Sequence, residues 1–345
     1  MQERGLIARA IDVGFGNVKF TKGYDQEGKE VVCEMFPSLA PSAASMGLDG
    51  YMGQRNTVIV QAGSSKFEVG PDAMLAMNTN ASRSMDIDFP LSDQYLALTR
   101  GAMHYMDLER IDVLVVGLPV SSIGSLGDKV RQRMVGEHRI VAKTVRVGEC
   151  IVVPQPVGGM WDYAVRHRAI PQFKESTCLL VDPGWFTMDW LVTKDMKIVP
   201  GRTDAANNAG MGAVVRAISE SMGKRISERD GRPCEITEQI VQRIDKALYS
   251  NGVARINGKE EQVEAHLDSG KKIMRDGMQK MMASLGSRSD IDCVIVVGGA
   301  AALYAPSVCE VFGADMVRVS QSPVFANVRG FQIMATQRAK QTAAA

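Results

Sequence analysis

Short apolar runs separated by glycine-bearing turns fill the N-terminal part of the chain. The first run ends in Asp12, and a turn over residues 13–17 separates it from the next run. Runs of this length, bounded by turn residues, are typical of strands. The pattern predicts strands over residues 6–11, 18–21, 31–36, 57–60 and 66–69. The chain therefore begins as a β-meander rather than as a βαβ unit.

Longer segments with helical periodicity follow the meander. Ser92 precedes the first of them and is suited to cap a helix that runs through Met106. The pattern of this region predicts helices over residues 93–106, 125–134 and 160–167, and strands over residues 112–116, 139–147 and 151–153.

The opening pattern recurs in the second half of the chain. Another apolar run ends in Asp182, a turn over residues 183–186 follows, and apolar positions resume at Thr187. The predicted strands of this half cover residues 178–181, 187–192, 196–199, 293–297 and 315–319. The predicted helices cover residues 213–222, 237–249, 260–285, 300–312 and 324–340, and the charged residues 225–232 predict a solvated loop.

A strand, an acid, a tight turn and a second strand thus occur twice, about half a chain apart. Such self-similarity indicates a duplicated α/β domain. The mixed order of hairpins and helices favours mixed sheets covered by helices. The length of 345 residues is sufficient for two such domains.

The amino-acid composition disfavours several classes of function. The 40 basic and 39 acidic residues give a net charge of +1, which predicts no direct binding to nucleic acid or to a membrane. The 6 cysteines are scattered without a C-x-x-C pair, which favours a reducing, cytoplasmic compartment. No apolar segment approaches the roughly 20 residues of a membrane-spanning helix.

The first candidate motif runs from Asp12 to Lys19 and contains Gly14, Gly16 and Asn17. Glycines in a hairpin turn let backbone amides approach phosphate oxygens, and Lys19 adds a positive charge. Asp12 is suited to hold a hydrated divalent cation. An ordinary β-turn with flanking charges accounts equally well for this motif alone.

The second motif has the same layout and contains Asp182, Gly184 and Thr187. Two carboxylate turns, one from each half of a duplicated chain, are stronger evidence than either turn alone. Together they predict a clamp around a triphosphate and its cation.

Two further glycine-containing segments precede helices. Asn208, Gly210 and Gly212 open the helix predicted from residue 213, where free amides favour an anion or a ribose. Gly298, Gly299 and Ala300 follow a buried strand, where a flat base could lie on bare backbone. Common loop chemistry and close strand–helix packing remain the alternatives.

The order of these four motifs resembles that of the superfamily of actins, DnaK-type chaperones and sugar kinases. Residues 154–158 and 324–331 resemble its two interdomain connections. Within the superfamily the chain is most similar to bacterial and plasmid actins of the ParM/StbA type. That similarity lies in its length, in Gly117-Leu118-Pro119 and in Asn327-Val328-Arg329-Gly330.

The resemblance implies an α/β, duplicated, ribonuclease H-like fold with a nucleotide cleft between two actin-like domains. Residues 1–155 with 325–345 would form the first domain, and residues 156–324 the second. The implied protein is a slow nucleotide hydrolase that binds ATP or GTP with Mg²⁺ and polymerises. Its implied partners are further copies of itself and an adaptor protein on plasmid centromere DNA, which it would segregate.

The resemblance also assigns roles to individual residues. Asp12 and Asp182 would hold the cation, largely through water, and Gln155 would orient the attacking water. The phosphates would contact the first and second loops, and the nucleoside would contact the glycine-containing segments. The nucleotide-binding residues are then Asp12, Gly14, Gly16, Asn17, Lys19, Gly184, Thr187, Asn208, Gly210, Gly212, Gly298, Gly299 and Ala300. The catalytic residues are Gln155 and Asp182.

The second loop departs from the family pattern. Trp185 and Phe186 stand where small or acidic residues are usual, and Pro183 has no N–H. We expect these aromatics to pack into a neighbouring domain or subunit.

Two other functions remain open at this point. A small-molecule kinase of the same superfold would need a carboxylate base near the γ-phosphate, where the chain has Gln155. A nucleotide-dependent binding module with little turnover would fit the aromatic second loop.

Overall fold

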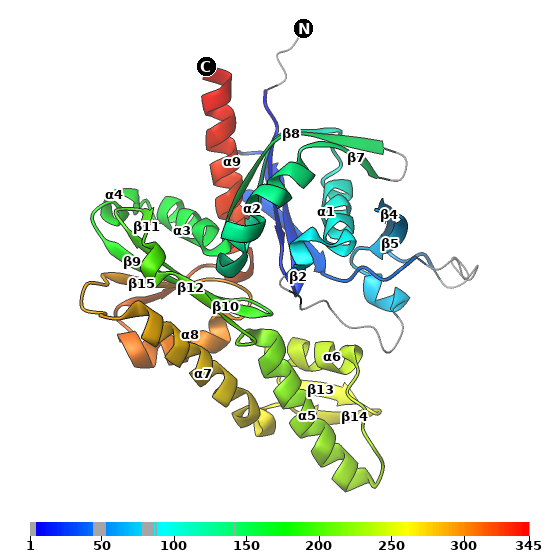
Figure 1. The fold of residues 1–345 in the computed structure, drawn as a ribbon. Helices are drawn as coiled ribbons and strands as arrows, with labels where there is room; N and C mark the ends of the chain where they lie inside the picture. The colour runs from blue at the N-terminus through cyan, green and yellow to red at the C-terminus, as the bar shows by residue number, and fades with distance from the viewer. Residues whose placement is uncertain (1–4, 44–52, 78–85, 87, 141–142, 345) are drawn as a thin grey trace.

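The computed structural model describes residues 5–43, 53–77, 86, 88–140 and 143–344. They form two α/β halves, one built on each of two large mixed sheets, and a smaller region carried by the second half (Figure 1). Short hairpins complete the described strands.

The first sheet has the strand order β3-β2-β1-β6-β8-β7. The central strand β1 pairs antiparallel with β2 and parallel with β6. Its strands are β1 (Ala8–Val13), β2 (Asn17–Tyr24), β3 (Val31–Pro37), β6 (Arg110–Leu118), β7 (Gly136–Ile140) and β8 (Lys143–Pro154). The predicted β-meander is confirmed.

The second sheet repeats this topology in the order β11-β10-β9-β15-β16, with β12 added beside β10. Here β9 takes the place of β1, since it pairs antiparallel with β10 and parallel with β15. Its strands are β9 (Thr177–Pro183), β10 (Thr187–Lys194), β11 (Lys197–Ile198), β12 (Asp204–Asn207), β15 (Cys293–Val296) and β16 (Val317–Val319). The predicted duplication is therefore present in the sheet order.

Helices cover both faces of each sheet. Alternating side chains of β1 divide between two cores: Ile11 packs with α1 (Asp93–Met106) and α2 (Val120–Met134), while Ala10 packs with α9 (Ala326–Ala344). On the second sheet, Leu179 faces α5 (Met211–Asp230), α7 (Asp268–Leu285) and α8 (Ala301–Phe312), while Leu180 faces α3 (Gln155–Arg166) and α4 (Ile170–Phe173).

The helices α3 and α9 follow the two points where the chain passes between the sheets, and they pack directly against each other. Figure 1 shows α9 rising beside the first sheet and α3 lying with the second. Each half therefore has one sheet-covering helix at the junction. The predicted boundaries at residues 155/156 and 324/325 stay a prediction.

Short elements complete the described chain. The strands predicted over residues 57–60 and 66–69 are confirmed as a hairpin of β4 (Val58–Ala62) with β5 (Ser65–Val69), and this hairpin packs beside α1. A second hairpin, β13 (Val253–Ile256) with β14 (Lys259–Gln262), lies beside α6 (Glu238–Leu248). The 3₁₀ helices are η1 (Ala73–Ala76), η2 (Phe89–Leu91), η3 (Pro200–Arg202), η4 (Glu264–His266) and η5 (Pro323–Phe325).

Several element predictions were wrong. The helix predicted over residues 260–285 begins only at Asp268, because Asn257 and Gly258, both at positive φ, form the turn of the β13–β14 hairpin. The strand predicted over residues 139–147 is a hairpin between β7 and β8. The solvated loop predicted over residues 225–232 is largely helical, since α5 continues to Asp230 and ends at Gly231 with φ +67°.

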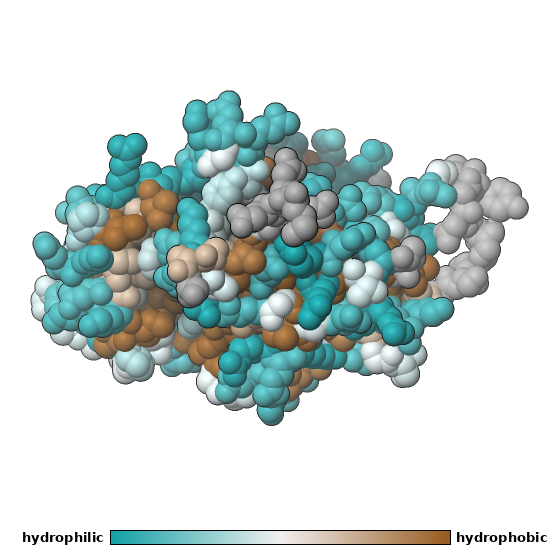
Figure 2. All heavy atoms as spheres, turned by 90° about the horizontal axis from the view of Figure 1, so that it is seen from above, coloured by the Kyte–Doolittle hydropathy of each residue, from teal (hydrophilic) through white to brown (hydrophobic). Residues whose placement is uncertain are grey.

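Hydrophilic residues cover most of the face seen in Figure 2, and hydrophobic groups lie between them, most densely over the half at the left of that view. Within the described ranges, no helix combines the length and the apolar character needed to cross a membrane.

Candidate functional site

The two acid turns adopt the same backbone geometry. We call residues 14–16 the first loop and residues 184–186 the second loop. The amide of Gly14 donates to the carbonyl of Asn17 at 3.1 Å, and the amide of Gly184 donates to the carbonyl of Thr187 at 2.9 Å. The two loops thus end the central antiparallel hairpins of the two sheets in equivalent ways.

Asp12 is fully buried at the end of β1, and two side chains bind its carboxylate. Lys19 Nζ lies 2.9 Å from Oδ2, and Gln155 Nε2 donates to Oδ1 at 2.6 Å. A Cβ added at Gly14 would lie 3.5 Å from Lys19 Nζ and 3.2 Å from the Asn17 carbonyl oxygen. One acidic, one cationic and one amide side chain, all predicted from the sequence, therefore lie together beside the first loop.

Ser38 supports the first loop from β3's end and was not predicted. Its hydroxyl donates to the carbonyl of Gly14, and its amide donates to the carbonyl of Gly16 at 3.0 Å. A single serine after a strand carries no sequence signal for this role.

Asp182 is buried at the corresponding end of β9. Asn327 Nδ2 donates to its Oδ2 at 2.6 Å. Burial raises the pKa of Asp182 to about 6, although the Asn327 hydrogen bond and the charge of Lys19 act in the opposite direction. The negative charge of Asp12 also raises this pKa, so the two carboxylates lie within electrostatic range of each other.

Gly298 closes tightly against Asp182. Its φ is +83°, and an added Cβ would lie 2.0 Å from Asp182 Oδ1. The amide of Ala300 donates to the carbonyl of Pro183 at 3.3 Å. Gly299 is instead exposed, and the nearest atom to its added Cβ, Val324 Cγ2, is 3.9 Å away. The exposed backbone on which a nucleotide base is expected to lie is therefore at Gly299. Gly298 instead leaves room for the Asp182 carboxylate.

The segment around Gly210 is hydrogen-bonded to the second loop. The amides of Gly210, Met211 and Gly212 donate to the carbonyls of Phe186, Gly184 and Trp185 at 3.3, 2.8 and 2.7 Å. Asn208 precedes this segment at φ +57° and is exposed. The second and third motifs predicted from the sequence thus form one structural unit at the start of α5.

Aromatic side chains connect the two loops across the halves. The rings of Phe15 and Phe186 lie 4.9 Å apart, and Phe15 also contacts Phe89 at 5.3 Å. A Cβ added at Gly16 would lie 3.0 Å from Trp185 Cβ. The expectation that the second-loop aromatics pack into a neighbouring domain is confirmed for the other half of the same chain.

Thr187 and Asp189 form an interaction that sequence analysis missed. The Thr187 hydroxyl donates to Asp189, and the amide of Val120 donates to Asp189 Oδ1 at 2.7 Å. Asp189 from the second sheet therefore caps α2 of the first half. Burial raises the pKa of Asp189 to about 7. The hydroxyl predicted to contact phosphate is itself buried and occupied by this carboxylate.

Among the residues that the structure describes, no three His, Cys, Asp or Glu side chains cluster as a metal site. Asp12 and Asp182 are the acids at the two loops. A pair of carboxylates suits a hard divalent cation that keeps several waters and shares phosphate oxygens.

Comparison with protein families matches residues 10–158 to the N-terminal domain of actin-like proteins. Comparison with curated protein sequences gives no match.

Several solved structures share the fold over nearly the whole chain. A 15-stranded ParM filament from Clostridium botulinum is 18% identical with a TM-score of 0.74, over 96% of this chain and 99% of that one. An archaeal actin homologue, Ta0583, in complex with ADP is 18% identical with a TM-score of 0.71, over 96% and 100%. The apo pSK41 ParM protein is 18% identical with a TM-score of 0.66, over 98% and 99%. These likenesses establish the predicted two-domain actin-like fold.

Proposed function

Because the chain is an actin-like protein, by fold over its length and by sequence over residues 10–158, we propose that it binds ATP or GTP with Mg²⁺ between its halves and polymerises. Head-to-tail contacts between identical subunits build open filaments when the rotation between them does not close. The ParM filament from Clostridium botulinum supports assembly of this kind.

One observation carries this proposal. Asp12 and Asp182 end equivalent central strands of the two sheets, and each is buried and bound by a side-chain amide. Two buried acids at facing loops would be unfavourable without a compensating positive charge. Lys19 supplies part of that charge, and a hydrated Mg²⁺ held between the carboxylates and the phosphates would supply the rest.

The loops fit phosphate by their backbone. Each turn is closed by one backbone hydrogen bond, from Gly14 to Asn17 and from Gly184 to Thr187. Backbone amides of the loops and Lys19 would bind phosphate oxygens. The amides of Gly210, Met211 and Gly212, expected from the sequence to be free for an anion, instead donate to the second loop and hold it in place. The ADP complex of the archaeal homologue supports a nucleotide in the corresponding place. The exposed Asn208 and Gly299 are then the groups nearest the nucleoside.

Gln155 is the residue that we assign to the attacking water. Its amide nitrogen is held by Asp12 at 2.6 Å, which leaves its carbonyl oxygen to accept a hydrogen bond from water. An amide orients water without removing the proton, so hydrolysis should be slow. Slow hydrolysis would in turn set how long the contacts between subunits last.

The cellular role that we propose is plasmid segregation through an adaptor protein bound to centromere DNA. The net charge of +1 favours an adaptor over direct DNA binding. The ParM likenesses support this role.

A nucleotide-dependent binding module with little turnover is the second candidate. The contact between Phe15 and Phe186 favours it, because these rings lie between the loops that would enclose the γ-phosphate. The Thr187 hydroxyl is also bound to Asp189 instead of being free for phosphate.

Replacement of Asp182 tests the nucleotide site. Asp182→Asn preserves the buried shape, and should reduce Mg²⁺-dependent hydrolysis of ATP or GTP by about two orders of magnitude because the charge that organises the cation is lost. Asp195→Asn is the matched control, since Asp195 is an exposed acid at the far end of the same hairpin. Turnover by Asp182→Asn within about threefold of wild type would remove Asp182 from the site.

A further inference from the structure

The two helices at the junction begin with the same short pattern. Gln155 is the first residue of α3, and Gly158 follows three positions later. Asn327 is the second residue of α9, and Gly330 follows three positions later. Each helix therefore starts with a side-chain amide, and a glycine follows almost one turn further on.

Each amide binds the carboxylate of one loop. Gln155 Nε2 donates to Asp12 at 2.6 Å, and Asn327 Nδ2 donates to Asp182 at 2.6 Å. Asp12 and Asp182 hold equivalent places in the two sheets. The duplication therefore extends beyond the acid turns to the side chains that bind them.

The orientation of the Asn327 amide follows from its surroundings. Asn327 is 5% exposed, and across the described part of the chain its Oδ1 has no hydrogen-bond donor. Turning the amide over would place Oδ1 against the Asp182 carboxylate, where two acceptors would repel each other. Donation from Nδ2 to Asp182 is the arrangement that the chemistry allows.

The two glycines mark the point where α3 and α9 cross. A Cβ added at Gly158 would lie 2.2 Å from the Asn327 carbonyl oxygen. A Cβ added at Gly330 would lie 1.8 Å from the Gly158 carbonyl oxygen. The backbones are in direct contact, so a shift of one helix must move the amide at its start.

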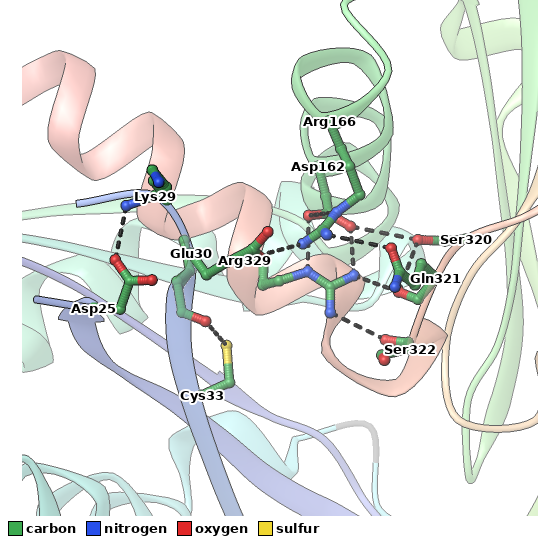
Figure 3. Close-up of polar contacts among 11 residues, drawn as sticks. Asp25, Lys29, Glu30, Cys33, Asp162, Arg166, Ser320, Gln321, Ser322 and Arg329 are labelled. Atoms are coloured by element: carbon green, nitrogen blue, oxygen red, sulfur yellow. Dashed lines mark hydrogen bonds and ion pairs between the residues drawn. The ribbon is translucent and has the colours of Figure 1, made fainter. Parts of the chain in front are cut away.

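A buried ion pair also joins α3 and α9 (Figure 3). Arg329 Nε and Nη2 donate to the two oxygens of Asp162 on α3 at 2.8 and 2.6 Å. Arg329 Nη2 also donates to the carbonyl of Gln321 at 2.7 Å. Arg166 of α3 reaches Glu30 of the first half at 3.1 Å. Asn327 therefore projects from a helix start that is held rigidly.

We propose that Asn327 is a positioning residue, the counterpart of Gln155 in the second half, which holds the Asp182 carboxylate for the cation and couples it to the helix crossing. This inference rests on the proposed nucleotide site. Asn327 orients the carboxylate that faces Mg²⁺, while Gln155 orients the carboxylate of the first loop. A change at either carboxylate is then transmitted to the junction through one side chain.

Binding of a fluorescent ATP or GTP analogue, measured against Mg²⁺ concentration, tests the inference. Asn327→Leu keeps the approximate side-chain volume and removes the hydrogen-bond donor to Asp182, while Asn327→Ala removes both the volume and the donor. Both variants should raise the half-saturating Mg²⁺ concentration about tenfold, because a buried carboxylate loses its donor. Gln332→Ala is the matched control, since Gln332 is a buried amide of the same helix that binds Thr21 and the Ala8 carbonyl instead of the loops.

Thermal unfolding of each variant separates folding from positioning, and the Leu variant serves if the Ala variant does not fold. A half-saturating Mg²⁺ concentration that stays at the wild-type value in Asn327→Leu would overturn the inference and leave the nucleotide site standing. A wild-type protein that binds neither analogue at any Mg²⁺ concentration would overturn the proposed function and this inference together.

Discussion

Lys19 and Asp189 occupy equivalent positions in the two halves and carry opposite charges. Each is the cross-strand partner of its loop acid, Lys19 of Asp12 and Asp189 of Asp182. In the first half the pair forms an ion pair at 2.9 Å. In the second half two acids lie on neighbouring strands, and burial raises the pKa of both carboxyls.

These raised pKa values predict how stability depends on pH in protein freed of nucleotide and divalent cations. The pKa of Asp189 rises from 3.8 to about 7, so the folded state binds a proton that the unfolded state has released. Stability from this group is therefore present below about pH 4 and lost as pH rises through about 7. Asp182 contributes in the same direction up to about pH 6.

Asp189→Asn should flatten this dependence. The asparagine keeps an acceptor for the Val120 amide but has no proton to lose. Urea unfolding between pH 4 and pH 8 should show that the free energy of unfolding decreases less in the variant than in wild type. The difference should be a few kcal/mol, because each tenfold change in proton affinity corresponds to about 1.4 kcal/mol. An unchanged slope between pH 6 and pH 7 would contradict the account of Asp189.

At the residue scale, the sequence predicted the acids and glycines of the loops and the side chains that bind Asp12, but not the side chain that binds Asp182. Asp12, Lys19 and Gln155 come together as predicted from their motifs and the resemblance. Asn327 stood in a recognised motif without an assigned role, because its partner Asp182 is 145 positions away. A comparison of Gln155-x-x-Gly158 with Asn327-x-x-Gly330 would have found it.

At the element scale, the crossing of α3 and α9 depends on the pair between Arg329 and Asp162. Both side chains are almost completely buried, at 6% and 3% exposure. Arg329→Ala would leave the buried Asp162 carboxylate with only the more distant Arg166, at 3.8 Å, and the Ser320 hydroxyl, at 3.3 Å. The substitution should lower the free energy of unfolding by about 3 kcal/mol. Denaturant unfolding measures this change.

The same helix provides the control for that experiment. Arg338 pairs with Glu149 at 3.0 Å, but both side chains are substantially exposed. Arg338→Ala should therefore change the free energy of unfolding by less than about 1 kcal/mol. Equal effects of the two substitutions would show that the buried pair does not hold the crossing.

The two loops are joined by the ring contact between Phe15 and Phe186, which must break when the halves separate. Such a pair contributes about 0.5–1.5 kcal/mol beyond its buried area. Phe186→Ala should therefore raise the association rate of a fluorescent nucleotide several-fold, measured by stopped flow. Phe312→Ala is the control, because Phe312 is a partly buried phenylalanine of α8 that packs on the second core. Equal rates for Phe186→Ala and wild type would mean that the contact does not limit opening.

Most elements with strong local signals were predicted, and an element start fixed by a distant partner was not. Ser92 caps α1 with its side chain, as predicted, and Thr237, which was placed inside the next helix, caps α6. The start of α2 was placed five residues late, because its cap is Asp189 from the other half. The β13–β14 hairpin was missed although Asn257-Gly258 is a strong local turn signal.

At the scale of the whole molecule, the duplication accounts for the fold, the site and the junction. The repeat of an acid after an apolar run indicated two related halves, and the two sheet orders confirm it. The sequence indicated that the second-loop aromatics pack into a neighbouring domain, but it could not show that Phe15 is the partner of Phe186, because the two lie far apart along the chain. Nor could it show that α3 and α9 cross at glycines, which depends on both halves folding together.

Nucleotide-dependent sedimentation tests the central claim most directly. Purified protein at tens of micromolar is centrifuged with Mg²⁺ and either ATP, GTP, a slowly hydrolysed analogue or no nucleotide. Nucleotide bound to both halves should favour one relative orientation and lower the concentration needed for assembly. We predict pelleted filaments with a triphosphate, longest-lived with the analogue, and soluble protein without nucleotide. Protein that stays soluble and monomeric in all four conditions would contradict the account.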